Sequence, residues 1–209
     1  MMDILLPASV ETLQMVVAST ILAALGGIPL GVLLARAPRY IHRPLSVVVN
    51  VGRSLPFIIL LVLLVPVTRT LVGTTIGSVA AIVPLSIGAI PFFARLVESA
   101  LHEVDPGLIE AGRALGMRGY ALVTKVMLPE ALPGLVRGLT VTVVAIVGYS
   151  AMAGVVGGGG LGDLAIRYGY QRFESDVLFA TVILLIVGVQ AVQVGGDVLA
   201  KRLDRRNKS

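Results

Sequence analysis

The chain of 209 residues contains no cysteine and no tryptophan. Without thiols it cannot form disulfides or thiolate metal sites. Its only two histidines, His42 and His102, are far apart in the sequence, and neither has an evident nucleophile or acidic partner. These absences argue against a metal site and against a membrane-embedded enzyme, and we expect this chain to bind no cofactor of its own.

Charged residues are also scarce, at 14%, whereas 56% of the residues are hydrophobic. This composition is too apolar for a soluble domain of this length and indicates a membrane protein. The net charge of +5 does not indicate nucleic-acid binding, because the basic residues flank apolar segments and do not gather with stacking aromatics. None of the three lysines follows a glycine, so the glycine run at 157–160 is not a phosphate-binding loop.

Five segments are apolar and long enough to cross a bilayer, which takes about 20 residues. They cover residues 12–35, 44–68, 74–94, 138–156 and 177–196. The first is not expected to be a cleavable signal, because Asp3 and Glu11 precede it in place of a positive region. We therefore predict an all-α membrane protein with one transmembrane domain over residues 10–203 and a basic tail at 204–209.

Acidic residues are absent from all five predicted spans, which argues against an ion-coupled secondary transporter. Arg53 is the one charge within a span and costs roughly 2.5–3.5 kcal/mol at a helix centre on insertion scales. The apolar residues that follow it each favour insertion by about 0.3–0.6 kcal/mol, so the span still inserts. Asn50, Arg53 and Ser54 share one helical face. We interpret them as an intramembrane polar stripe facing the interior; the alternative is that Arg53 reaches the headgroups.

The loop between the third and fourth spans is too charged to lie in lipid, yet it contains the start and stop signals of ordered helices. Asp105 followed by Pro106 predicts a helix start, and Gly116 predicts a helix stop. A second helical run follows, and we expect Pro129 and Pro133 to end it. The loop is therefore predicted to fold as two short helices outside the bilayer.

Two small residues of this loop, which covers residues 103–133, are Ala111 and Gly112. They would let the backbone of another protein approach closely, so the loop is a candidate docking element. The alternative is an amphipathic surface helix that only lies among the headgroups.

The loop resembles the EAA loop of bacterial ABC-importer permeases, whose pattern is EAA-x3-G-x9-I-x-LP. The corresponding residues here are Glu110, Ala111, Gly112, Gly116, Val126, Leu128 and Pro129. Gly112 stands where the family has Ala, and Val126 where it has Ile; both positions stay small or apolar. The resemblance implies a coupling helix that fits a groove on a separate ATPase subunit, with Leu115 among the coupling residues.

The resemblance extends from about residue 10 to about residue 200 and is greatest to permeases of methionine importers. The segments that carry it are RSLPFIILLVLLVP at 53–66, GLIEAGRALG at 107–116, KVMLPEALPGLV at 125–136 and VGYSAMAGVVGGGGLG at 147–162. It implies a type I importer permease with five transmembrane helices and a cytoplasmic coupling helix. The implied partners are a second copy of the chain, two ATPase subunits that bind ATP-Mg, and an extracytoplasmic substrate-binding protein. Methionine, its D-form or close analogues are the implied cargo, with another amino acid as the alternative.

The distribution of basic residues predicts the orientation in the bacterial inner membrane. With the amino terminus outside, 13 of the 17 lysines and arginines lie on the inner side and three on the outer side. The carboxyl terminus and the coupling loop are then cytoplasmic, on the side where ATP is available.

The outer end of the fourth span holds our candidates for gate or path-lining residues. They are Tyr149, Ser150 and Met152, which directly precede the glycine run. For Met152, ordinary packing is the alternative. The glycines are expected to permit irregular backbone, and residues 161–173, with three aromatic rings, to rest in the outer interface.

Overall fold

The computed structural model describes residues 2–204, and every regular element in that range is helical. The elements are α1 (Met2–Arg36), α2 (Arg39–Ser54), α3 (Phe57–Leu63), α4 (Val65–Val72), α5 (Ser78–His102), α6 (Pro106–Ala114), α7 (Gly119–Leu122), the π-helical η1 (Val123–Met127), α8 (Leu128–Val155), α9 (Gly160–Leu164), the π-helical η2 (Ala165–Tyr170) and α10 (Ser175–Leu203). Apart from Asp204, the predicted basic tail at 204–209 lies outside the described residues.

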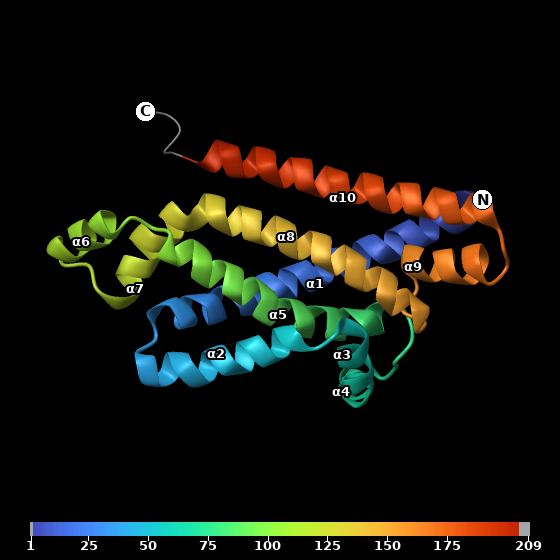
Figure 1. The fold of residues 1–209 in the computed structure, drawn as a ribbon, viewed down its shortest axis with the longest axis horizontal. Helices are drawn as coiled ribbons and strands as arrows, with labels where there is room; N and C mark the ends of the chain where they lie inside the picture. Colours follow the sequence, from blue (N-terminus) through green and yellow to red (C-terminus); the bar gives the residue numbers. More distant parts are fainter. Residues whose placement is uncertain (1, 205–209) are drawn as a thin grey trace.

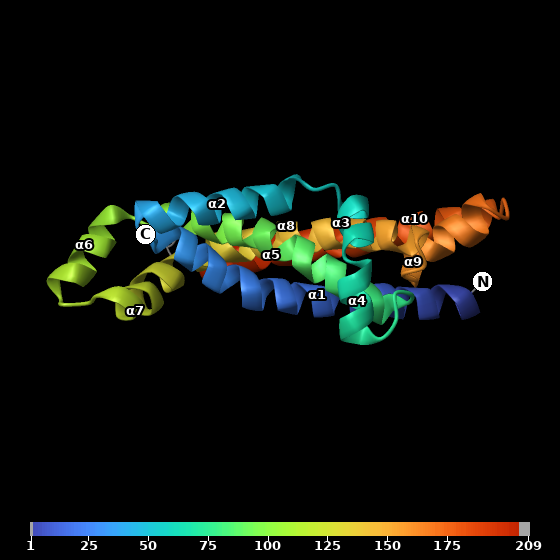
Figure 2. The same ribbon diagram turned by 90° about the horizontal axis from the view of Figure 1, so that it is seen from below.

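The long helices α1, α5, α8 and α10 run side by side along the molecule (Figure 1). The α6–α7 loop lies at one end, and α9 lies at the other end with the amino terminus. The short helices α3 and α4 stand across the long axis (Figure 2). The two ends of the bundle therefore carry different structures, an ordered polar loop and a glycine-rich turn.

Four helical stretches in the described chain are long and apolar enough to cross a membrane: α1, α5, residues 119–155 and α10. The second predicted span, 44–68, is the remaining one, and it is not one straight helix. It breaks between α2 and α3, with a bend of 102°. Pro56 causes the break, because proline disfavours helical dihedrals at the preceding residue, and Leu55 accordingly has the extended angles φ −74° and ψ 126°.

Several helices extend beyond the spans that hydropathy predicts. The first helix starts at Met2, and α5 continues to His102. The prediction that Pro129 and Pro133 end a helix is wrong, since α8 begins at Leu128 and contains both. Pro129 lies in the first turn of α8, where a missing N–H costs little, and the preceding π-helical turn joins that helix to α7 without a gap. The loop and the fourth span are consequently one continuous helical stretch.

Close backbone packing joins α1 to α5 at the centre of the bundle. A Cβ atom built on Gly31 would lie 2.5 Å from Val97 Cβ and 2.6 Å from the Ala94 carbonyl oxygen. Gly27 likewise faces Phe93. The two glycines, four residues apart, allow this approach in the way that small residues do in membrane helices.

The end of the bundle that carries the amino terminus and α9 is held together by hydrogen bonds between residues far apart in the sequence. The Glu11 carboxylate accepts from the Gly160 N–H at 2.7 Å, and the Thr12 hydroxyl accepts from the Leu161 N–H at 2.8 Å. Both acceptors belong to α1 and satisfy the first free amides of α9. The irregular backbone expected of the glycine run is confirmed, with φ +75° at Gly159 and +74° at Gly160.

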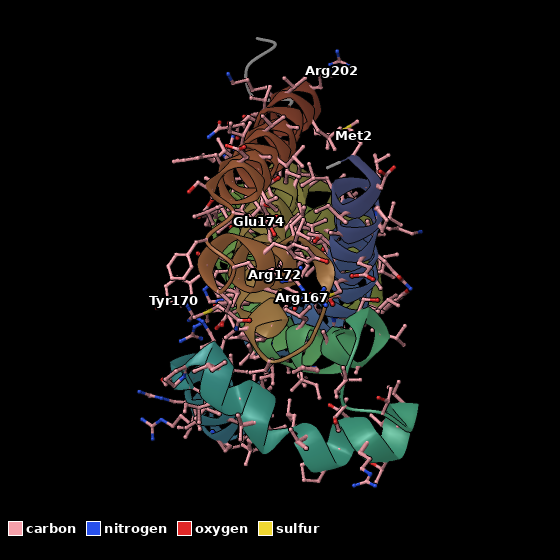
Figure 3. The ribbon with its side chains drawn as sticks, turned by 90° about the vertical axis from the view of Figure 1, so that its right-hand side faces the viewer. Met2, Arg167, Tyr170, Arg172, Glu174 and Arg202 are labelled. Atoms are coloured by element: carbon pink, nitrogen blue, oxygen red, sulfur yellow. The ribbon has the colours of Figure 1, made fainter. Side chains whose placement is uncertain are left out.

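Residues 161–173 do not simply rest in the interface. Leu161 and Leu164 are buried in a cluster with residues of α1 and α10. The end of the segment is exposed: Tyr170 points away from the bundle (Figure 3), and Phe173 is 84% exposed. Tyr168, by contrast, packs partly buried against this cluster, and the leucines are core residues of this end.

Gly160→Ala tests this end of the fold. The added methyl would lie 2.6 Å from Thr12 Oγ1 and 2.8 Å from Met15 Cε, on a backbone with φ +74°. The left-handed backbone alone costs about 1–2 kcal/mol, and the overlap adds to it. We expect a clear drop in the thermal unfolding midpoint. Gly157→Ala, with φ +86° and a nearest contact of 3.4 Å, is the control for backbone strain alone and should lose less. Equal losses would contradict the packing argument.

Candidate functional site

The α6–α7 loop begins and ends where its sequence predicts. The Asp105 carboxylate accepts from the Gly107 N–H at 2.7 Å and caps α6, which has Pro106 in its first turn. After Ala114 the chain turns at Gly116, with φ +81°, and the Met117 N–H donates to the Gly112 carbonyl at 3.0 Å. These local bonds make α6 an ordered helix beyond the ends of the long helices (Figure 1).

Gly112 is buried inside this loop and does not face a partner. A Cβ atom at Gly112 would lie 2.9 Å from Leu122 Cδ1 and 3.3 Å from Val126 Cγ2. The expectation that Gly112 admits another protein's backbone is therefore wrong for this side of α6, because the chain's own second helix occupies it. Glu110 and Ala111 are exposed.

The exposed side of the loop offers an apolar surface outside the bundle. Leu115 is 78% exposed and Tyr120 is 83% exposed. Glu110 and Ala111 are exposed on the same loop, and these are the exposed residues that we expect a partner to contact. We call these four residues the coupling surface.

The second half of the loop is bound firmly to the membrane helices. Val123 and Met127, in the π-helical turn, are buried in one cluster with Leu101 of α5 and with Val104, which follows that helix. Of the remaining motif residues, Leu128 is half-buried and Pro129 is exposed at the start of α8. Ile109 of α6 packs against the same cluster, which also contains Ala131 and Leu135 of α8, so the cluster joins α6 to both α5 and α8.

A buried carboxylate joins α2 to α5 near the same end. Glu98, 6% exposed, accepts from Arg95 Nη1 at 2.6 Å and lies 3.0 Å from His42 Nε2. The sequence-based view that neither histidine has an acidic partner is thus wrong for His42. The predicted third span ended at residue 94, and hydropathy gave no sign that the helix continues and turns Glu98 inward. The only sequence signal was the i, i+3 spacing of Arg95 and Glu98.

The proposed polar stripe does not face the interior of this chain. Asn50, Arg53 and Ser54 are all exposed on α2. The Ser54 hydroxyl donates to the Asn50 carbonyl at 2.8 Å, and the Arg53 guanidinium lies 5.6 Å from the centre of the Phe92 ring. Only Val49 of α2 is buried, because a single side of this helix contacts the bundle.

The three gate candidates on α8 have different surroundings. Tyr149 stacks on Phe57 of α3, with ring centres 4.7 Å apart. Ser150 is buried and donates to the carbonyl of Val147, whereas Met152 is 45% exposed. Consecutive helix positions point in different directions, so the three do not form one lining. The structure instead brings Tyr149 and Phe57 to one small cavity with Arg53, a combination the sequence did not indicate.

Metal-ligating side chains do not cluster in residues 2–204: no group of three or more could hold an ion. Long apolar helices, a broken second span and an ordered polar loop at one end are the features of a multi-pass membrane protein. The chain belongs to the family described as "Binding-protein-dependent transport system inner membrane component", which matches residues 27–209. It is accordingly the membrane component of a transport system, as the EAA-like loop indicated.

Relatives match almost the full length of the chain. The probable D-methionine transport system permease protein MetI of Vibrio cholerae is 51% identical, over 98% of this chain and 94% of the relative. The methionine import system permease protein MetP of Bacillus subtilis is 44% identical, over 79% of this chain and 75% of the relative. The similarity to these relatives therefore extends well beyond the loop at 103–133.

Solved structures confirm the predicted fold. A chain of the MetNI methionine ABC transporter in an inward-facing conformation superposes with a TM-score of 0.94 at 47% identity, covering 98% of both chains. An amino acid ABC transporter structure with histidines matches with a TM-score of 0.74 at 21% identity, which shows a shared fold only. The type I importer permease fold is thus shared with the first of these.

Proposed function

We propose that this chain is the permease subunit of an ATP-driven importer that moves methionine, including its D-form or close analogues, into the cytoplasm. Support comes from relatives named for methionine transport over nearly the whole chain and from the similarity to a methionine transporter structure. The single observation that carries the proposal is the ordered coupling surface on a loop bound to two membrane helices. A permease for another amino acid is the alternative.

The proposed partners follow from the location of this surface. Two ATPase subunits would bind ATP-Mg and receive the coupling surface of each permease chain in a groove. A second copy of this chain would complete a two-fold pore, since homo-oligomers usually close by such symmetry. An extracytoplasmic binding protein would deliver the cargo. The amino terminus would lie outside, and the loop and carboxyl terminus in the cytoplasm, in accordance with the distribution of basic residues.

Physically, the loop would act as a lever. Closure of the ATPase pair would displace α6, and the buried cluster around Val123 and Met127 would move α5 and α8 with it. Because residues 119–155 form one helical stretch, the displacement reaches the gate candidates at the outer end of α8. Access to the pore would then alternate between the two sides.

Uptake of labelled amino acids into vesicles that contain the reconstituted complex tests the function. We expect ATP-dependent uptake of methionine that unlabelled methionine suppresses and other amino acids suppress less. Glu110→Lys, on the coupling surface, should reduce uptake about tenfold, since it reverses a charge at a contact. Glu103→Lys, an exposed carboxylate outside the motif, is the control. Uptake without ATP, or preference for another amino acid, would contradict the proposal.

A further inference from the structure

A groove of about 440 Å³ lies between α6 and the ends of α1 and α5. Its floor is apolar and includes Leu101, Val104, Ile109 and Met127. The last residue of α1 and the last residue of α5 both line it. The length and composition of α1 and α5 allow both to cross a membrane, and in that case the groove at their ends would lie near the boundary between hydrocarbon and headgroups.

The rim of the groove is basic. Arg36 from α1, His102 from α5 and Arg113 from α6 line it, and no carboxylate does. Of the acids nearest in sequence, Asp105 caps α6, Glu103 lines a separate hollow against α8 and α10, and Glu110 is exposed on α6 outside the lining of the groove. The groove therefore has a positive potential that no side chain within it neutralises.

Its two arginines lack ionic partners among the described residues. Arg36 and Arg113 form none of the ion pairs there, although four such pairs occur. Arg36 Nη1 donates to the Met127 sulfur at 3.5 Å, and a thioether is a weak acceptor. A guanidinium offers five N–H donors and matches a phosphate with two parallel bonds, so most of this capacity is left for a ligand.

We propose that this groove binds one anionic phospholipid, with its phosphate at the arginine rim and the start of its acyl chains on the apolar floor. Basic pockets between membrane helices on the cytoplasmic side bind anionic headgroups in this way. A zwitterionic lipid fits less well, because its ammonium group would lie beside two guanidinium groups. The lipid would add a connection between α6 and α1, whose end already contacts the loop at Met127. This inference does not depend on the cargo.

Native mass spectrometry of the purified complex in detergent tests the site. The protein is titrated with phosphatidylglycerol or with phosphatidylcholine of the same acyl chains. We expect one phosphatidylglycerol to be retained per permease chain, with phosphatidylcholine retained about tenfold less, a difference of about 1.4 kcal/mol. The double variant R36Q/R113Q should lose this preference. R118Q, which removes an exposed arginine of the same loop outside the groove, should keep it.

Three results would overturn the proposal. Equal retention of the two lipids by the unmodified protein would show no headgroup recognition. Displacement of phosphatidylglycerol by inorganic phosphate would indicate a site for a free anion. Loss of the ATPase subunit from R36Q/R113Q with unchanged lipid retention would make the groove a protein contact. If the double variant does not fold, R113Q alone decides, since its side chain is exposed on α6 and its substitution leaves the bundle intact.

Discussion

Gly112→Leu should abolish ATP-dependent uptake, whereas Gly112→Ala should retain most of it. The first added carbon already meets Leu122 Cδ1 at 2.9 Å, the flexible end of a side chain that can shift for a methyl group. A leucine needs room that Val126 and Leu122 occupy, and overpacking of this kind costs about 1–3 kcal/mol. The α6 helix would separate from α7 and lose its fixed position on the lever. Uptake and coupled ATPase activity measure the loss.

Ala111→Leu is the matched control, because it adds a bulkier side chain at the next position, on the exposed side of α6. We expect it to leave the loop folded but to weaken association with the ATPase subunit. Limited proteolysis within residues 103–133 separates the two cases, since Gly112→Leu should increase cleavage and Ala111→Leu should not. Normal uptake by Gly112→Leu would refute the lever. Increased cleavage in both variants would contradict the assignment of Gly112 to the buried side of α6 and Ala111 to its exposed side.

Glu98→Ala should loosen α2 from the bundle and lower both stability and transport. The carboxylate accepts from Arg95 and contacts His42 of α2. Apart from this contact, α2 is held to the bundle by little buried surface, since Val49 is its only buried residue. Removing one member of a buried charge pair costs about 3–5 kcal/mol. Here both partners are about one-third exposed, so water compensates them in part and we expect about 2 kcal/mol. The thermal unfolding midpoint and proteolytic release of α2 measure the effect.

A double-mutant cycle between Glu98→Ala and His42→Ala separates this bond from general damage. If the contact holds α2, the double variant should lose less than the sum of the single losses, because the second change removes a bond already broken. Glu103→Ala, an exposed acid one turn beyond, should change stability by less than about 0.5 kcal/mol. Additive losses would show that Glu98 does not act through His42.

Local signals in the sequence predicted four of the five helical spans and the ordered loop between the third and fourth of them. The start of α6 at Asp105 and Pro106 and its stop near Gly116 depend on bonds within a few residues, so they can be read along the chain. The motif that indicates the importer family lies within the same short stretch. The roles assigned to the coupling surface, the gate candidates and the polar residues of α2 remain predictions.

Hydropathy was a poorer guide to helix ends and helix faces. Hydropathy indicates which residues fit into hydrocarbon, whereas a helix continues as long as its backbone hydrogen bonds are made. For this reason α5 extends to His102 and carries Glu98 into the packed bundle. It also treated residues 44–68 as one span, although Pro56 alone is sufficient to bend the chain there.

The amino-acid order by itself determined that this chain is a helical membrane protein, where its main spans lie and where an ordered loop interrupts them. Those properties depend on transfer into lipid and on bonds between near neighbours. The three-dimensional packing decided that Gly112 faces inward, that Glu98 meets His42 across 56 residues, and that Glu11 caps α9 across 149. Such contacts depend on the distance and direction between helices, which no local pattern in a single sequence contains.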